Sequence, residues 1–409
     1  MSRRDPVQRL TEPGTQPRDI VDWQPRSAVG RLLRILAPGL SWALVFGLSV
    51  LLVWLCVDGL AQHLGGGAQR LLAGVSLAGV VVLCGMIAVG SAAPLTRGPS
   101  VGWLLSEDAR YAQVARIGLI GCGAAVLGVQ LVASEFAFVT NPLILGFVGL
   151  SVIPAVSLVV YIQRTDVTSP DPLGLLVAVY LLGLVLANLA AISNAAVTSA
   201  GLITAAGEQI TRPVAVSLFF LVVVAPVEEV IKLLAGGLYT YRSEAFDAVA
   251  AGAVYGAVAG LGFATIENAI FITEQVIGAS SPASALSDGS SITVGRAFAG
   301  PGHVIWSGIA GYYLGLARFN GRFGTMLVCK GLLIAVLLHG VYNISVSFLV
   351  APVASMTAFS TISIFIMFAV VYHGLCFGFL LYKLLRYRDA HFDAHNGTHI
   401  ESELAEFDP

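Results

Sequence analysis

Charged residues are scarce in this chain. They make up 11% of its 409 residues, whereas hydrophobic residues make up 56%, and the mean hydropathy is +0.84. A soluble domain carries about a quarter charged residues, so the composition excludes an ordinary soluble protein. The net charge of −2 also provides no basic surface for nucleic acid, and we expect no nucleic-acid partner. The shortage of charge favours an integral membrane protein.

Several motifs of soluble enzymes are missing as well. The five cysteines form no C-x-x-C pair, and the chain contains no G-x-S-x-G and no H-E-x-x-H motif. These absences exclude a cysteine metal site and a serine nucleophile of the G-x-S-x-G type. A disulfide framework is excluded because the cysteines all lie in apolar stretches, where they are ordinary small buried residues: Cys56, Cys84, Cys122, Cys329 and Cys376.

The chain does contain a series of apolar runs of about 20 residues, each long enough to cross a ~30 Å hydrocarbon core as a helix. Basic residues gather before the first run and in every second loop, which places both termini in the cytoplasm by the positive-inside rule. The sequence therefore predicts an all-α polytopic membrane protein, a bundle of about ten transmembrane helices. The expected spans lie near 40–61, 71–93, 114–134, 143–162, 173–193, 214–239, 247–273, 298–318, 327–349 and 359–384.

Polar segments flank and interrupt this bundle. Residues 1–38 are polar and expected to be cytoplasmic, and with no cleavable signal peptide visible we expect the first span to be a retained signal-anchor. Residues 278–291 are rich in Gly, Ser and Ala, which predicts a flexible outer loop. Residues 385–409 are polar and acidic, which predicts a disordered cytoplasmic tail. Since we expect no helix in this tail, we expect no metal site from its regularly spaced histidines: His391, His395 and His399.

Ionisable residues inside the spans are the most informative feature. Each costs ~2.5–3.5 kcal/mol at the bilayer centre on insertion scales, so such residues usually face a cavity or a partner. Small residues recur every fourth position on the same spans, which lets helices approach closely. We therefore predict that the polar residues of the sixth to ninth spans meet around a water-filled cavity that is open to the outer face: Glu228, Glu229, Lys232, Glu267, Asn268, His303, His339 and Asn343.

Within the sixth span, Glu228 and Lys232 are one helical turn apart and can form an ion pair. Glu229 is rotated by about 100° from Glu228, so a purely structural ion pair leaves one carboxylate uncompensated. A transporter with a proton relay is one alternative class, because buried carboxylates and histidines also carry protons. It predicts an inverted repeat, whereas residues 40–190 hold no counterpart of these polar motifs. A catalytically inactive membrane scaffold is the other alternative.

Four of these motifs, in this order, resemble the PrsW family of intramembrane proteases, which is related to the type II CAAX prenyl proteases. The E-E-x-x-K of residues 228–232 resembles the first motif, and the F-x-x-x-E-N of residues 263–268 resembles the second. His303 in GPGHVIW and His339 in LLHGVYN resemble the third and fourth, with Asn343 one turn after the last. The similarity covers about 150–350. We therefore assign 141–384 to a protease core and 39–140 to additional N-terminal spans.

The resemblance implies a multi-pass protease of the bacterial plasma membrane. Its substrate is expected to be a membrane-anchored, single-span protein such as an anti-sigma factor, cleaved on its extracytoplasmic side. Two mechanisms remain open at this stage. In one, Glu267, His303 and His339 hold Zn²⁺ and Glu228 is the general base. In the other, no metal is bound: Glu228 takes the proton of water, Glu267 helps to hold that water, and His339 with Asn343 stabilises the oxyanion. Lys232 balances the negative charge in both.

Overall fold

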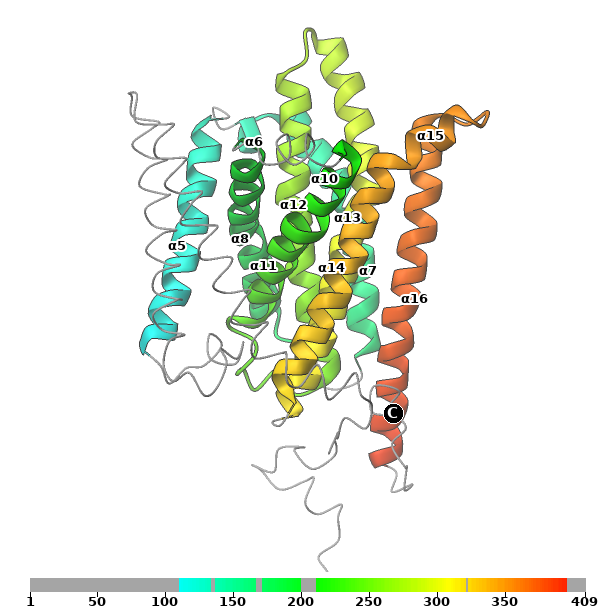
Figure 1. Cartoon of the computed structure of the whole chain (residues 1–409). Helices are drawn as coiled ribbons and strands as arrows, with labels where there is room; N and C mark the ends of the chain where they lie inside the picture. Colours follow the sequence, from blue (N-terminus) through cyan, green and yellow to red (C-terminus); the bar gives the residue numbers. More distant parts are fainter. Residues whose placement is uncertain (1–109, 134–136, 167–170, 200–210, 321–322, 396–409) are drawn as a thin grey trace, which may run out of the picture.

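The structure is a computed structural model that describes residues 110–133, 137–166, 171–199, 211–320 and 323–395. The described part is entirely helical (Figure 1). Its elements are α5 (Arg110–Ala133), α6 (Ala137–Thr140), α7 (Pro142–Thr165), α8 (Leu173–Ser199), α10 (Arg212–Phe219), the π-helical η1 (Phe220–Val224), α11 (Ala225–Gly237), α12 (Val249–Ile277), α13 (Pro282–Phe319), α14 (Gly324–Phe348), α15 (Val350–Ser355) and α16 (Thr361–His395).

The prediction of an all-α polytopic membrane protein is confirmed. Six helical stretches of the described part are long and apolar enough to cross a membrane: Pro142–Thr165, Leu173–Asn194, Arg212–Gly237, Val249–Ile277, Gly324–Ser355 and Thr361–Ala390. The expected spans 114–134 and 298–318 correspond to α5 and α13. Within α5 the structure has a shorter apolar stretch, Arg116–Gly128, and α13 is not among the six. The expected spans 40–61 and 71–93 lie outside the described residues, so the predicted number of about ten exceeds what the described part contains.

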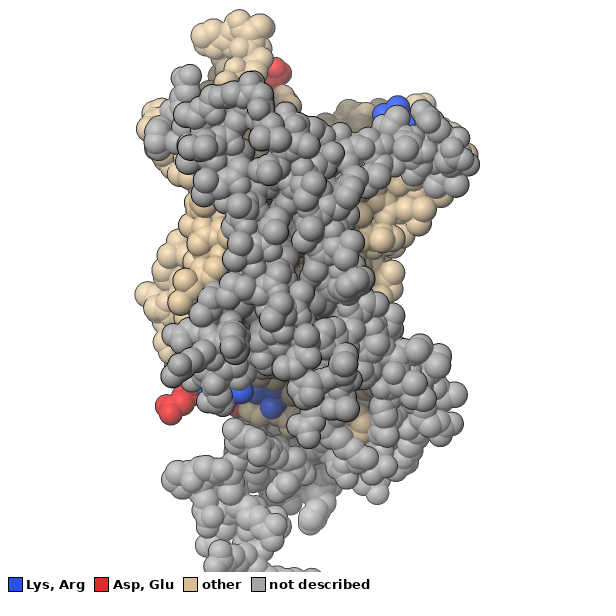
Figure 2. All heavy atoms as spheres, turned by 60° about the vertical axis from the view of Figure 1, so that its left-hand side comes forward, with Lys and Arg blue, Asp and Glu red and all other residues tan. Residues whose placement is uncertain are grey.

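The surface of the described part fits a lipid environment. In the face shown in Figure 2, the visible charged side chains of the described residues lie near its upper and lower ends, and none lies in the band between. Large apolar side chains are exposed on this bundle, among them Val222 at 66% and Leu375 at 72%. Such exposure is costly in water but favourable against lipid tails.

The prediction of a flexible loop at 278–291 is wrong. Only 278–281 separates α12 from α13, because the Ser-Pro pair begins a helix here. The Ser281 hydroxyl accepts a hydrogen bond from the Ser284 backbone N–H at 3.2 Å, the Ser284 hydroxyl accepts one from the Ser281 N–H at 2.9 Å, and Pro282 follows the cap. A reciprocal cap followed by proline is a strong helix start. The α12–α13 hairpin consequently extends beyond its neighbours at the top of Figure 1.

The C-terminal helix is longer than expected. α16 continues to His395, so the first part of the expected tail 385–409 is helical rather than disordered. Its remainder, including His399, lies outside the described residues.

α12 is the central helix of the described bundle. In its apolar 18-residue stretch, 89% is buried inside the protein, and the helix packs against α7, α8, α11 and α13. Its glycines face the backbone of α13, since a Cβ added at Gly256 or Gly260 would overlap the carbonyl of Ser307 or His303 respectively. The predicted small-residue ridge therefore exists, and it brings the backbones of α12 and α13 into contact. This contact fixes the depth of His303 relative to Glu267.

A π-helical turn precedes the acidic pair of α11. The Ala225 N–H donates to the Phe220 carbonyl, five residues earlier, and Pro226 follows, with no N–H to continue the usual ladder. A proline disturbs the regular pattern of helical hydrogen bonds, and a π-turn is one form that this disturbance takes. Such a turn holds one extra residue, which rotates everything after it by about 100° relative to a regular helix. The direction in which Glu228 and Glu229 face depends on this turn.

Candidate active site

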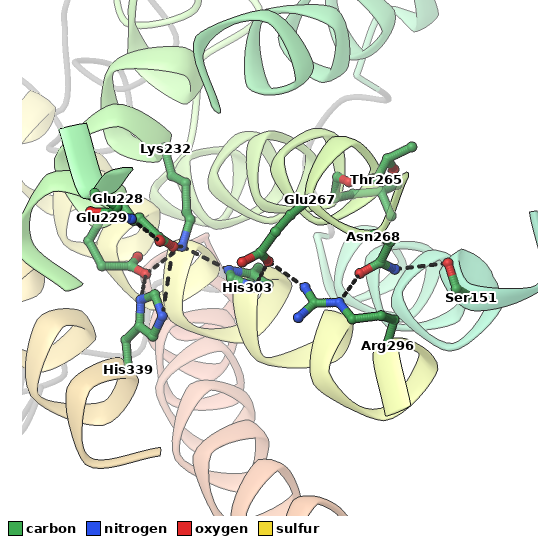
Figure 3. Close-up of polar contacts among 12 residues, drawn as sticks. Ser151, Glu228, Glu229, Lys232, Thr265, Glu267, Asn268, Arg296, His303 and His339 are labelled. Carbon is green, nitrogen blue, oxygen red and sulfur yellow. Dashed lines mark hydrogen bonds and ion pairs between the residues drawn. The ribbon is translucent and has the colours of Figure 1, made fainter. Parts of the chain in front are cut away.

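Four helices converge on one buried polar cluster (Figure 3). α11 contributes Glu228, Glu229 and Lys232, α12 contributes Glu267, α13 contributes His303 and Arg296, and α14 contributes His339. The central residues are almost completely buried, with exposures of 0% to 5% for Glu228, Glu229, Lys232, His303 and His339. Of the eight polar residues predicted to meet, the structure brings together Glu228, Glu229, Lys232, Glu267, His303 and His339.

Lys232 lies at the centre of the cluster. Its Nζ is 2.8 Å from Glu229 Oε1, 2.9 Å from His303 Nδ1 and 3.5 Å from Glu228 Oε2. It also lies 4.3 Å from the centre of the Phe263 ring. An ammonium has three N–H donors, so these three acceptors satisfy it fully. The predicted ion pair with Glu228 exists, but Glu229 is the nearer partner.

The two histidines are each held by a carboxylate. His303 Nε2 lies 2.8 Å from Glu267 Oε2, and because its Nδ1 accepts from Lys232, the ring proton is placed on Nε2. His339 Nδ1 lies 2.9 Å from Glu229 Oε1, so this nitrogen donates. The other nitrogen of His339, Nε2, then offers a lone pair toward Glu228 Oε2 at 3.7 Å. A carboxylate behind an imidazole is the usual way to orient a metal-binding histidine.

Glu267 is the accessible acid of the cluster, with 24% of its side chain exposed, compared with 6% for Glu228 and 0% for Glu229. Besides His303, it forms a close ion pair with the Arg296 guanidinium. Water or substrate therefore reaches Glu267 more easily than the two acids of α11.

A scan of protein-family models matches residues 171–373, about half of the chain, to the PrsW family of intramembrane metalloproteases. The match contains the four motifs and all four helices of the cluster. The chain belongs to the PrsW family of intramembrane proteases.

Curated relatives agree with this assignment. The chain is 24% identical over 197 residues to Protease PrsW of Geobacillus kaustophilus (strain HTA426), which covers 48% of this chain and 77% of the relative. It is 27% identical over 200 residues to Protease PrsW of Oceanobacillus iheyensis, which covers 49% and 82%. No solved structure matches. The protein is thus a multi-pass bacterial membrane protease, and the comparisons do not favour the transporter or scaffold alternatives.

Two of the PrsW motif residues have no described polar contact with the acids and histidines at the centre of the cluster. Asn268 is directed away from it: its Nδ2 donates to Ser151 Oγ on α7 at 2.9 Å, and its Oδ1 accepts from Arg296 Nε at 2.7 Å. Asn343 is half-buried, and none of the polar contacts described for the cluster involves it. The expected oxyanion role of Asn343 therefore has no support in this geometry.

Three contributors to this PrsW site were missed from the sequence. Asn194 of α8 donates to Glu228 Oε1 at 3.1 Å. Trp306 stacks on His339 with ring centres 4.6 Å apart and planes 17° apart. Arg296 falls between the expected spans 247–273 and 298–318, whereas in the structure it lies on α13 two turns before His303. A longer predicted α13 would have shown Arg296 and His303 on one helix face.

One group of side chains in the described part can hold a metal ion. Glu228, His303 and His339 each offer a ligand atom, and these atoms all lie within 4.8 Å of one another. This set differs from the expected one, since Glu228 takes the place of Glu267. The family's description as metalloproteases agrees with such a cluster.

Proposed function

We propose that this cluster hydrolyses a peptide bond of a single-span membrane protein, and that it does so with Zn²⁺. The observation that carries the proposal is the approach of three buried donor atoms, from Glu228, His303 and His339, beside an accessible carboxylate, Glu267. The resemblance to proteases alone does not assign these roles. The geometry supports the zinc mechanism better than the metal-free mechanism.

Glu228, His303 and His339 would hold the ion. Two imidazoles and one carboxylate are a ligand set found in catalytic zinc sites. His339 is prepared for this role because Glu229 fixes its Nδ1, which leaves Nε2 as the ligand. His303 Nδ1 becomes free once Lys232 moves off it, and Lys232 keeps Glu229 as its partner at 2.8 Å.

Bound zinc would supply Lewis acidity at this site, which makes a water molecule acidic near neutral pH. Glu267 is then the general base, since it is the accessible acid and the ligand role falls to Glu228. It takes a proton from the attacking water and later gives it to the leaving amine. His303 Nε2–H, at 2.8 Å, keeps the Glu267 carboxylate in place. In the metal-free alternative, Glu228 is the base instead.

The position of the site supports the proposed substrate class. The acids of the cluster and His339 lie on helical stretches that are long and apolar enough to cross a membrane, so a peptide would reach them from within or beside the bilayer. A single-span protein satisfies this condition, and an anti-sigma factor cleaved on its outer side is one example. Glu267 and the α12–α13 hairpin share the end of α12 that we assign to the outer side.

Trapping uncut substrate tests the proposal. Membrane proteomes of cells that carry the wild type, Glu267→Gln or Glu228→Gln are compared by mass spectrometry. We expect the same small set of single-span proteins to accumulate uncut with both variants. Glu274→Gln is the matched control, because Glu274 lies on α12 but is exposed, and it should leave the wild-type pattern unchanged. Normal cleavage in both cluster variants would refute the assigned site.

A further inference from the structure

Arg296 joins two consecutive residues of α12 across the helix interface. Its Nε donates to Asn268 Oδ1 at 2.7 Å, and its Nη2 forms the close pair with Glu267 Oε2. The guanidinium carbon lies 4.8 Å from the centre of the Phe271 ring. Asn268 is itself anchored, since its Nδ2 donates to Ser151 Oγ. The guanidinium therefore has a fixed position and plane directly beside Glu267 (Figure 3).

The hydrogen-bond donors of the cluster can be counted. Lys232 has three N–H groups and three acceptors. The ring N–H groups of His303 and His339 are directed at Glu267 and Glu229. A guanidinium has five N–H donors, and the contacts to Asn268 and Glu267 use one nitrogen each, Nε and Nη2. Among the described residues of the cluster, Arg296 is therefore the cation beside Glu267 that retains donors, on Nη1, for a ligand. The N–H that Lys232 would release on zinc binding lies at His303 Nδ1, across the imidazole ring from Glu267.

The charges of Arg296 and Glu267 also favour a role for Arg296 in binding an anion. In the resting site the Arg296 guanidinium is neutralised by the Glu267 carboxylate. When Glu267 takes a proton from water, that negative charge disappears at the moment when the peptide carbonyl oxygen gains one. The positive charge of Arg296 then has the new oxyanion as its counterion. The site can exchange one anion for the other without rearranging its cation, which is the arrangement that stabilises a transition state most effectively.

We propose that Arg296 is a catalytic residue that binds the carbonyl oxygen of the scissile peptide and stabilises the oxyanion. This inference rests on the proposed function, in which Glu267 is the base. The oxygen of water forms a bond to the carbonyl carbon as its proton goes to Glu267, and the electron pair of the C=O bond moves to the oxygen held by Arg296. Collapse of the oxyanion breaks the C–N bond, and the amine nitrogen takes the proton from Glu267. Asn268 is a positioning residue that aims Arg296.

The test uses the purified full chain in liposomes, with a single-span protein that accumulates uncut in the Glu267→Gln strain as substrate. Loss of one oxyanion donor costs about 10²–10³-fold in kcat, so we expect Arg296→Met to lose that factor in kcat with KM nearly unchanged. Arg296→Lys keeps the charge and should recover at least about tenfold of the loss, with imperfect geometry. Arg212→Met is the control: Arg212 is an exposed arginine at the start of α10, and the variant should match the wild type.

Folding and the underlying function are checked separately. Bound zinc and the thermal unfolding midpoint of Arg296→Lys should match those of the wild type. The inference is overturned if Arg296→Met keeps its kcat, if the loss lies in KM, or if folded Arg296→Lys is no more active than Arg296→Met. Glu267→Gln is assayed in parallel. An active Glu267→Gln refutes the proposed function itself, whereas an inactive Glu267→Gln beside an active Arg296→Met refutes only the role of Arg296.

Discussion

Replacing Gly260 with alanine tests whether the α12–α13 contact sets the geometry of the active site. A Cβ added at Gly260 would lie 2.8 Å from the His303 carbonyl carbon and 3.0 Å from Ser307 Oγ, and it would overlap the His303 carbonyl oxygen. Carbon atoms pack favourably at about 3.5–4.0 Å. Because the two nearest of these atoms, the carbonyl oxygen and carbon of His303, are backbone, the two helices must separate by about 1 Å to accommodate the methyl group.

Two effects of different size follow from that separation. Overpacking of this kind costs about 1–3 kcal/mol of stability. A displacement of about 1 Å between catalytic groups costs about 10²-fold in rate. The methyl group at position 260 pushes against His303 itself. We therefore expect Gly260→Ala to fold with a lowered thermal midpoint and to lose about 10²-fold in kcat.

The assay compares this variant with Gly300→Ala on α13. The nearest atoms to a Cβ at Gly300 lie at 3.7–3.9 Å, which is ordinary contact, and alanine favours the helix by up to about 1 kcal/mol. We expect Gly300→Ala to keep wild-type cleavage of the reconstituted substrate and an equal or higher unfolding midpoint. Equal activity and stability of the two variants would show that α12 and α13 are not in contact at Gly260.

Three further predictions concern other parts of the protein. Glu229→Gln should weaken zinc binding by about 10–100-fold in a chelator competition, because Glu229 orients His339; unchanged affinity would contradict this. Trp306→Ala should destabilise the chain by about 3–5 kcal/mol in denaturant unfolding, whereas Trp306→Phe keeps most of the stacking on His339; equal stability of the two would refute the packing role. Burial raises the pKa of Asp171, between α7 and α8, to about 6, from about 3.9 when unfolded. The folded chain then binds this proton more tightly, so stability falls as pH rises from about 4 to 6. Asp171→Asn should remove that fall in thermal unfolding, and the exposed control Asp288→Asn should not.

The sequence was sufficient for the all-α membrane class and for the meeting of the main polar residues. Both depend on local features: apolar length predicts a spanning helix, and small residues every fourth position predict a close helix contact. Glu228, Glu267, His303 and His339 lie on or beside such helices, and the motif order resembles PrsW. These features do not depend on how a helix is rotated about its own axis.

The roles of individual residues could not be obtained in the same way. Whether Glu228 or Glu267 joins the two histidines depends on the rotation of α11, which follows a π-helical turn that hydropathy does not reveal. Asn268 follows Glu267 directly but turns toward Ser151, because neighbouring residues on a helix point about 100° apart. Arg296 was missed because the Gly- and Ser-rich stretch before it was interpreted as a loop, whereas the Ser281 cap makes it helical.

The metal content of the purified protein tests the central assignment most directly. We predict about one zinc ion per chain, the single catalytic ion that a His₂Glu set holds, in the wild type and in the inactive Glu267→Gln variant, and loss of zinc in Glu228→Gln. Zinc that remains in Glu228→Gln but is lost from Glu267→Gln, or an active wild-type enzyme without bound metal, would contradict the assigned ligands.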